Sequence, residues 1–207
     1  GKFKDLTDFY TPEKDLLDKE IKIETMLKVA MAFKEVGLYE EAIRTFKGIR
    51  LSELNLQQGG AYFTGFAETY LGNGDKDDAR DLLEKAKNYN LQPVDKQRVS
   101  RTLALLYIEE NMLNDAQSLC NSIIEGERLL PEDELADVYF LSGRILNLQK
   151  RYSDAEAAIN AAPGMPDRIK NDSLMSAYME LGKAYYHTGN YPGAVRSFEK
   201  GFDLGYA

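Results

Sequence analysis

The sequence predicts an all-α protein built as a stack of antiparallel helix pairs. Five alanines recur at separations of 37, 37, 39 and 39 residues, and they are Ala42, Ala79, Ala116, Ala155 and Ala194. Each has a small residue twelve positions before it, a bulky residue nine before it and an apolar residue four after it. A period between about 20 and 50 residues is typical of stacked supersecondary units, so this recurrence predicts the fold.

The recurring residues suit two helices in each unit. The small residues are Ala30, Ala67, Ala104, Gly143 and Gly182; the bulky ones are Phe33, Tyr70, Tyr107, Leu146 and Tyr185; the later apolar ones are Phe46, Leu83, Cys120, Ile159 and Phe198. Small side chains let two helix backbones approach closely, and bulky side chains one turn away fill the adjacent groove. We therefore expect the small and bulky residues on a first helix and the alanine on a second helix.

A short turn is expected between the two helices of each unit. The turns begin at Gly37, Gly74, Asn111, Lys150 and Gly189. Glycine and asparagine are favoured where a helix ends in the left-handed backbone conformation. Lys150 departs from this preference, so we expect its turn to be the most strained or the most irregular of the five.

These residues resemble the tetratricopeptide repeats. The last unit has the fullest match, with Leu181-Gly182, Tyr185, Gly189, Tyr191, Ala194 and Phe198, and the first unit follows with Ala30, Phe33, Gly37, Tyr39, Ala42 and Phe46. The third unit has Asn111, Leu113 and Cys120 at usual glycine and aromatic positions, and the fourth lacks the turn glycine and the late aromatic. The resemblance implies a right-handed superhelical solenoid of antiparallel helix pairs, although the period exceeds the family's usual length of about 34 residues.

The expected organisation is a lead-in segment over residues 1–20 and a single solenoid over residues 21–207. Its five repeats are expected at about 23–54, 60–92, 97–130, 136–165 and 173–207. Prolines at 12, 93 and 131 predict helix starts, where the first turn tolerates proline. Asp172 or Ser173 is the expected N-cap of the last unit's first helix. Apolar residues around Phe202 are expected to be exposed, to meet another copy, or to be covered by residues outside this sequence.

The chemistry-bearing residues do not form a catalytic constellation, so we expect no enzyme activity, metal or cofactor. The chain has one Cys and one His, too few for an ordinary metal cluster or Cys/His nucleophile pair. Cys120 occupies the apolar slot of its unit and is expected to be a buried small hydrophobe. His187 lies at the end of a first helix and is interpreted as a surface or groove contact.

Composition excludes further classes of function. The net charge of −8 does not supply the basic footprint that nucleic-acid binding needs. No apolar run approaches the roughly 18 residues of a membrane span. A single Cys excludes an internal disulfide, so a cytoplasmic location is favoured, with the periplasm or an anchored soluble segment as alternatives.

In the resembled family, the first helices line a concave groove that binds a peptide or helix. Carried over unit by unit, the resemblance implies these contact residues: Leu27, Met31 and Lys34; Thr64, Glu68 and Leu71; Arg98, Arg101, Leu105 and Ile108; Phe140, Leu141, Arg144 and Asn147; Met179, Lys183, Tyr186 and His187. The family's carboxylate clamp for chaperone tails needs Lys and Asn where this chain has Leu27 and Met31. We therefore do not expect a chaperone adaptor.

The later part of this set contains four cations in an acidic protein: Arg98, Arg101, Arg144 and Lys183. Such a strip favours a protein or peptide partner with acidic residues, because complementary charge steers encounter and sets register. The alternative is a solvated face on which Glu109, Asp137 and Glu180 neutralise the cations. The function we expect is a protein-binding scaffold. A self-assembling structural protein that uses its ends or convex face is one alternative, and a docking or regulatory domain of a longer protein is another.

Overall fold

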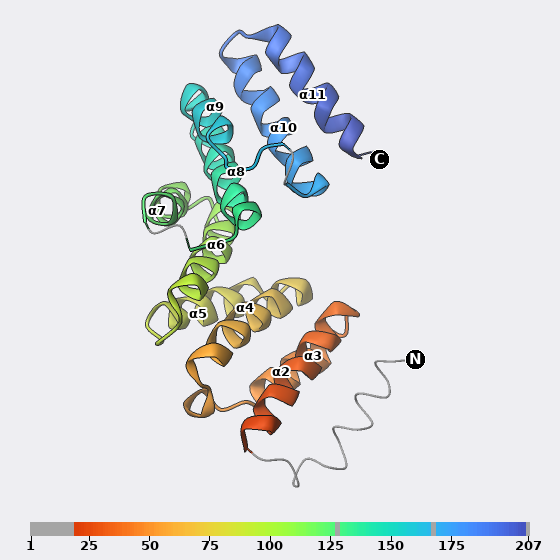
Figure 1. The fold of residues 1–207 in the computed structure, drawn as a ribbon, viewed down its shortest axis with the longest axis vertical. Helices are drawn as coiled ribbons and strands as arrows, with labels where there is room; N and C mark the ends of the chain where they lie inside the picture. Colours follow the sequence, from red (N-terminus) through yellow and green to blue (C-terminus); the bar gives the residue numbers. More distant parts are fainter. Residues whose placement is uncertain (1–18, 127–128, 167–168, 206–207) are drawn as a thin grey trace. The chain divides into compact units, whose positions relative to one another are not determined.

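The computed structural model describes residues 19–126, 129–166 and 169–205, and all regular secondary structure in these ranges is helical (Figure 1). The expected lead-in over residues 1–20, including the helix start at Pro12, lies almost entirely outside the described residues. The helices are α2 (Lys19–Glu35), α3 (Tyr39–Lys47), α4 (Leu56–Asn73), α5 (Lys76–Lys87), α6 (Pro93–Glu109), α7 (Leu113–Ile124), α8 (Glu132–Leu148), α9 (Tyr152–Asn160), α10 (Asn171–His187) and α11 (Tyr191–Gly205), with a short 3₁₀ turn at Leu51–Glu53.

Contacts divide the chain into two compact units, with the boundary inside α6 between residues 99 and 100. In the first unit, α2 packs against α3, α3 against α4, and α4 against α5. In the second unit, α7 packs against α8, α8 against α9, and α10 against α8, α9 and α11. The all-α fold of helix pairs is confirmed, while a single solenoid over residues 21–207 stays a prediction.

The five turns share one backbone geometry. Each contains a residue with a positive φ at the predicted position: Gly37 (77°), Gly74 (90°), Asn111 (60°), Lys150 (62°) and Gly189 (83°). In every case the next residue's N–H donates a hydrogen bond of 2.8–2.9 Å back to the carbonyl five residues earlier, as from Arg151 to Leu146. The Lys150 turn is therefore regular in its hydrogen bonds, and its strain lies in a β-carbon held in the left-handed region.

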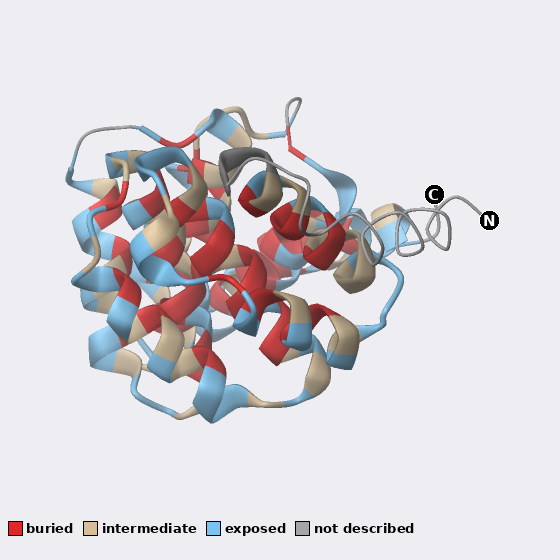
Figure 2. Ribbon diagram, turned by 90° about the horizontal axis from the view of Figure 1, so that it is seen from below, coloured by how far each residue is buried: buried red, intermediate tan, exposed pale blue. Residues whose placement is uncertain are grey.

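The recurring residues form the core, which Figure 2 shows as the buried faces of the helices. The five alanines are 0–3% exposed, and Phe46, Leu83, Cys120 and Ile159 are fully buried. At Gly143 and Gly182 the side chains of Ile159 and Phe198 lie so close to the helix backbone that an added β-carbon would overlap them. The small and bulky positions thus interlock within each pair as the sequence predicts.

Two predicted helix starts are wrong. α10 begins at Asn171 with Lys170 as its N-cap, so neither Asp172 nor Ser173 caps it. Lys170 has the extended backbone conformation of an N-cap. Asp172 therefore lies in the first turn of α10, where the helix dipole stabilises its negative charge. α8 begins after Pro131 rather than with it, whereas α6 begins at Pro93 as expected.

Candidate partner-binding groove

Two adjoining hollows lie along α6, α8 and α10 in the second unit. The first has a volume of about 360 Å³ and is lined by Arg101, Leu105, Asp137, Phe140, Leu141, Arg144, Asp172, Ser173 and Ser176. The second has a volume of about 330 Å³ and is lined by Arg144, Asn147, Leu148, Tyr152, Ser176, Glu180, Lys183 and His187. Because both include Arg144 and Ser176, we treat them as one surface, the α6–α8–α10 groove.

Helical periodicity brings these side chains to one face. On α8 the lining residues recur at spacings of three and four, from Asp137 through Phe140 and Arg144 to Asn147. On α10 the same spacing runs from Ser176 through Glu180 and Lys183 to His187. Residues three or four apart lie on the same side of a helix, so α8 and α10 present one lining face each.

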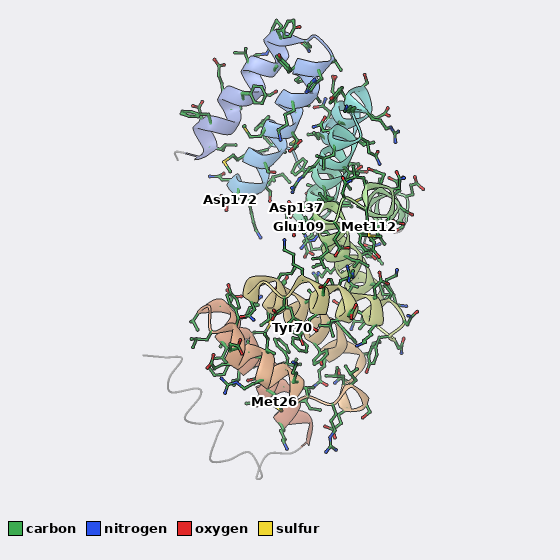
Figure 3. All side chains as sticks on the ribbon, turned by 180° about the vertical axis from the view of Figure 1, so that it is seen from behind. Met26, Tyr70, Glu109, Met112, Asp137 and Asp172 are labelled. Carbon is green, nitrogen blue, oxygen red and sulfur yellow. The ribbon has the colours of Figure 1, made fainter. Side chains whose placement is uncertain are left out.

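The first hollow has an apolar floor with charged edges. Phe140 and Leu141 are buried beneath it, and Leu105 is 41% exposed. Arg101 pairs with Asp137 at 3.5 Å, and Asp172 lines the same hollow from α10; Figure 3 labels both aspartates. The hollow can therefore take an apolar side chain of a ligand between polar walls.

The second hollow is polar and internally bonded. The Asn147 Nδ2 donates to the carbonyl and to the Oε2 of Glu180, both at 2.9 Å, and Lys183 donates to the Glu180 Oε1 at 2.7 Å. The Asn147 Oδ1 is buried and accepts no hydrogen bond from the described residues. The ring of His187 stacks on that of Tyr152, with centroids 4.1 Å apart.

The four predicted cations do not form a continuous basic strip. Arg101 pairs with Asp137 and Lys183 with Glu180, while Arg98 lies 3.5 Å from Asp95. Each of these three cations thus has a carboxylate nearby. Two of the carboxylates, Asp137 and Glu180, belong to acids that the sequence analysis names as candidate partners. Arg144 is exposed and has no ion pair or hydrogen bond with the part of the chain that the structure describes. Its guanidinium stands where the two hollows meet.

Eight of the eighteen predicted contact residues line the groove: Arg101, Leu105, Phe140, Leu141, Arg144, Asn147, Lys183 and His187. Leu27 and Ile108 are each 7% exposed and line neither of the two hollows, so they pack in the core. Met179 packs against Gly201 of α11, and the Tyr186 ring contacts His187 and Tyr191 at the turn between α10 and α11.

The remaining predicted residues belong to the first unit, and they are Met31, Lys34, Thr64, Glu68, Leu71 and Arg98. Met31 packs against Gly65, and the Glu68 carboxylate accepts a hydrogen bond of 2.6 Å from Lys34. Burial alone would lower the pKa of Lys34, but its contacts with Glu68 and Glu35 outweigh burial and raise the pKa. Lys34 and Glu68 thus form an internal pair between α2 and α4.

The sequence interpretation missed Leu148, Tyr152, Asp172, Ser173 and Ser176. Tyr152 is the most informative, because it begins a second helix while the resemblance assigns the groove to first helices. The signal that could have found it is the tyrosine three residues before the repeat alanine, which recurs as Tyr39, Tyr152 and Tyr191.

A larger hollow of about 690 Å³ lies elsewhere in the second unit. Its lining is wholly polar: Asn114, Gln117, Ser118, Asn121, Ser122, Glu125, Gln149 and Arg151. Without an apolar floor it offers no anchor of the kind that dominates protein interfaces.

The part of the chain that the structure describes presents neither a metal-binding cluster nor an activated cysteine nucleophile. Its His, Cys, Asp and Glu residues form no group of three or more that could hold a metal ion. Burial raises the pKa of the Cys120 thiol to about 12, so at neutral pH the thiolate that would act as nucleophile is not formed. Among the described helices, none combines the length and apolar character needed to cross a membrane.

Comparison with known proteins identifies the type of the last repeat. The profile of the tetratricopeptide-repeat family matches residues 174–204, which span α10 and α11. A comparison with curated proteins gives no match.

Solved structures with the same fold align over most of the chain. A Podospora anserina protein with nearly identical TPR-like repeats of the kinesin light chain type has a TM-score of 0.69 at 17% identity, covering 91% of this chain and 96% of its own. BtubC (BKLC) from P. vanneervenii has a TM-score of 0.69 at 16% identity, covering 99% and 87%. MamA MSR-1 has a TM-score of 0.62 at 18% identity, covering 90% and 98%. The tetratricopeptide-repeat resemblance is thereby confirmed, and at these identities the alignments show the fold alone.

Proposed function

We propose that this chain, which has the tetratricopeptide-repeat fold, is a non-enzymatic scaffold that binds a segment of a partner protein in the α6–α8–α10 groove. The observation that carries the proposal is the apolar hollow at Leu105, Phe140 and Leu141 beside the exposed guanidinium of Arg144. An apolar side chain buried in a pocket supplies most of the affinity of such an interface, and a charged group beside it sets register.

The groove selects one kind of segment. Arg101 and Lys183 already have carboxylate partners, so a uniformly acidic peptide would have to displace Asp137 and Glu180. Arg144 has no such internal competitor among the described residues. We therefore narrow the acidic-partner hypothesis to a segment with one apolar anchor and a carboxylate placed for Arg144.

The polar hollow would fix the backbone of that segment. The buried Asn147 Oδ1 has no donor within the described residues, and leaving a buried acceptor unsatisfied costs about 1–3 kcal/mol. A peptide N–H donating to it would remove this cost on binding. The stacked His187 and Tyr152 rings would form the apolar end of the same hollow.

Selection of short random peptides on the wild-type protein, followed by affinity measurement with two matched pairs of variants, tests the proposal. Arg144→Glu should weaken the selected peptides about tenfold or more, while Lys150→Glu, an exposed cation outside both hollows, should change affinity less than about twofold. Leu105→Ala should also weaken them, whereas Met112→Ala should not, although the two parent residues are similarly exposed at 41% and 40%. Failure to select any binder, or equal losses within each pair, would contradict the proposal.

A further inference from the structure

The α6–α8–α10 groove is lined by two charged side chains of opposite sign that lack an internal partner. Asp172, in the first turn of α10, is exposed and, like Arg144, has no ion pair or hydrogen bond with the described residues. The other Asp, Glu, Lys and Arg side chains that line the groove are paired: Arg101 with Asp137 and Lys183 with Glu180. We call Arg144 and Asp172 the two free charges of the groove.

The two free charges lie at different levels along the groove. α8 and α10 run along it in the same direction, because their early residues line the first hollow and their late residues line the second. Asp172 lines the first hollow only, whereas Arg144 and Ser176 line both. Ser176 follows Asp172 by four residues, which is a rise of about 6 Å along α10. The negative charge is thus about one helical turn nearer to the helix starts than the positive charge.

The ion pairs around the free charges do not change this polarity. The Arg101–Asp137 pair, at 3.5 Å, adds no net charge, so the first hollow holds two cations and two carboxylates. Lys170 lies two residues before Asp172, but its Nζ is 3.9 Å from an oxygen of Asp133 and it lines neither hollow. A uniformly acidic or uniformly basic segment therefore meets one attractive and one repulsive free charge.

A segment that binds the apolar floor covers both free charges, because the hollow that contains Leu105 and Phe140 is also lined by Arg144 and Asp172. A charge that is taken out of water without a partner is costly, and an opposite charge from the ligand offsets that cost. Arg144 needs a carboxylate for this purpose. Asp172 needs an ammonium or guanidinium group.

We propose that the partner segment carries a lysine or arginine on one side of its apolar anchor and an aspartate or glutamate on the other, and that Asp172 selects the basic side chain. This inference rests on the proposed function of the groove and adds the charge order of its ligand. The basic side chain lies toward the starts of α8 and α10, and the acidic side chain lies at Arg144, where the two hollows meet. The order of the two charges therefore fixes the direction in which the segment binds.

Peptide selection tests the role of Asp172. Short peptides with a fixed leucine and randomised flanks are selected on the wild-type protein, and basic residues should be enriched on one side of the leucine and acidic residues on the other. Asp172→Asn should lose the basic enrichment and keep the acidic one, whereas Asp172→Glu, which keeps the charge, should retain both. Asp133→Asn removes an acid from the first turn of α8, outside both hollows, and should select the same peptides as the wild type.

Exchanged charges test the direction of binding. The tightest wild-type peptide is compared with a version in which its basic and acidic residues change places. The exchanged peptide should bind the wild-type protein at least tenfold more weakly, because each of its charges meets a like charge. On the double variant Arg144→Asp and Asp172→Arg, the exchanged peptide should be the tighter of the two by at least tenfold. Structural damage could weaken both peptides, but it would not reverse their order.

The outcomes separate this inference from the proposed function. Peptides that depend on Leu105 and Arg144 but show no basic enrichment, or the same enrichment on Asp172→Asn, would overturn the inference and leave the proposed function standing. A double variant that does not prefer the exchanged peptide would overturn it as well. If no peptide can be selected on the wild-type protein, both proposals fail.

Discussion

Replacing Lys150 by glycine should stabilise the protein by about 1 kcal/mol. Lys150 is exposed and holds a φ of 62°, where the β-carbon of an L-residue costs roughly 1–2 kcal/mol. Glycine removes that cost but loses more conformational entropy on folding, which offsets about 0.4–1 kcal/mol. The net gain should raise the melting temperature by about 2–4 °C for a chain of this length.

Two control variants isolate the backbone contribution. Lys150→Ala removes the charge and keeps the β-carbon, so its melting temperature should stay near that of the wild type. Gly189→Lys makes the reciprocal change in the last turn, where φ is 83° and an added β-carbon would meet no atom within 4 Å. It should therefore destabilise by about 1 kcal/mol through conformation alone.

The melting temperature by circular dichroism and the urea midpoint give the readout. Our explanation of the turns is refuted if Lys150→Gly lowers both quantities, or if Lys150→Ala raises them as much as Lys150→Gly does. A Gly189→Lys variant with an unchanged melting temperature and urea midpoint would likewise show that these turns do not require the left-handed conformation.

Three further outcomes follow from the core. Phe46→Ala should cost about 3–5 kcal/mol in urea unfolding, because the ring is fully buried; a loss under about 1 kcal/mol would contradict its packing role. Gly143→Val should destabilise by about 1–3 kcal/mol, since its side chain would overlap Ile159; an unchanged urea midpoint would argue against this close approach. Burial raises the pKa of Tyr62 and of Cys120 to about 12, so both favour their neutral forms when folded. Stability should hold up to about pH 9 and then fall toward pH 12, as the unfolded chain ionises first; melting temperatures that do not fall between pH 9 and 11.5 would exclude this linkage.

The repeat register could be predicted because close packing admits few residues at each recurring position. Ala42 and its four counterparts are buried where two backbones meet, and no larger side chain fits such a contact without displacement. The turn residues are equally restricted, because a positive φ favours glycine or asparagine. The exception at Lys150 was visible in the sequence as a departure, and the structure gives its physical meaning.

The groove was predictable only in part, because surface residues obey weaker constraints. The resemblance locates one face of each first helix but does not say how deeply each side chain is buried. Leu27 and Ile108 were therefore predicted to lie on the groove surface, whereas the structure buries them. The sequence named Asp137 and Glu180 as candidate partners for the cations, but it did not show which cation each would meet, since Arg101 finds Asp137 on a different helix thirty-six residues away.

Helix ends were the least predictable local feature. The candidate cap Asp172 lies inside α10, because the chain adopts helical geometry one residue before it. Conversely, the Asn55 side chain accepts hydrogen bonds from the N–H groups of Gln57 and Gln58 and forms a capping box at the start of α4, which the sequence interpretation did not identify. Side-chain caps compete with other local bonds of similar strength, so sequence alone does not rank them.

The most direct test of the proposed scaffold function is a map of backbone amide shifts by NMR when a selected peptide is added. We predict the largest changes in α8 and α10 at residues that line the two hollows, centred on Arg144 and Ser176. Changes confined to the polar hollow of α7, around Gln117 and Asn121, would contradict the account, as would a peptide that shifts no residue of α8 or α10.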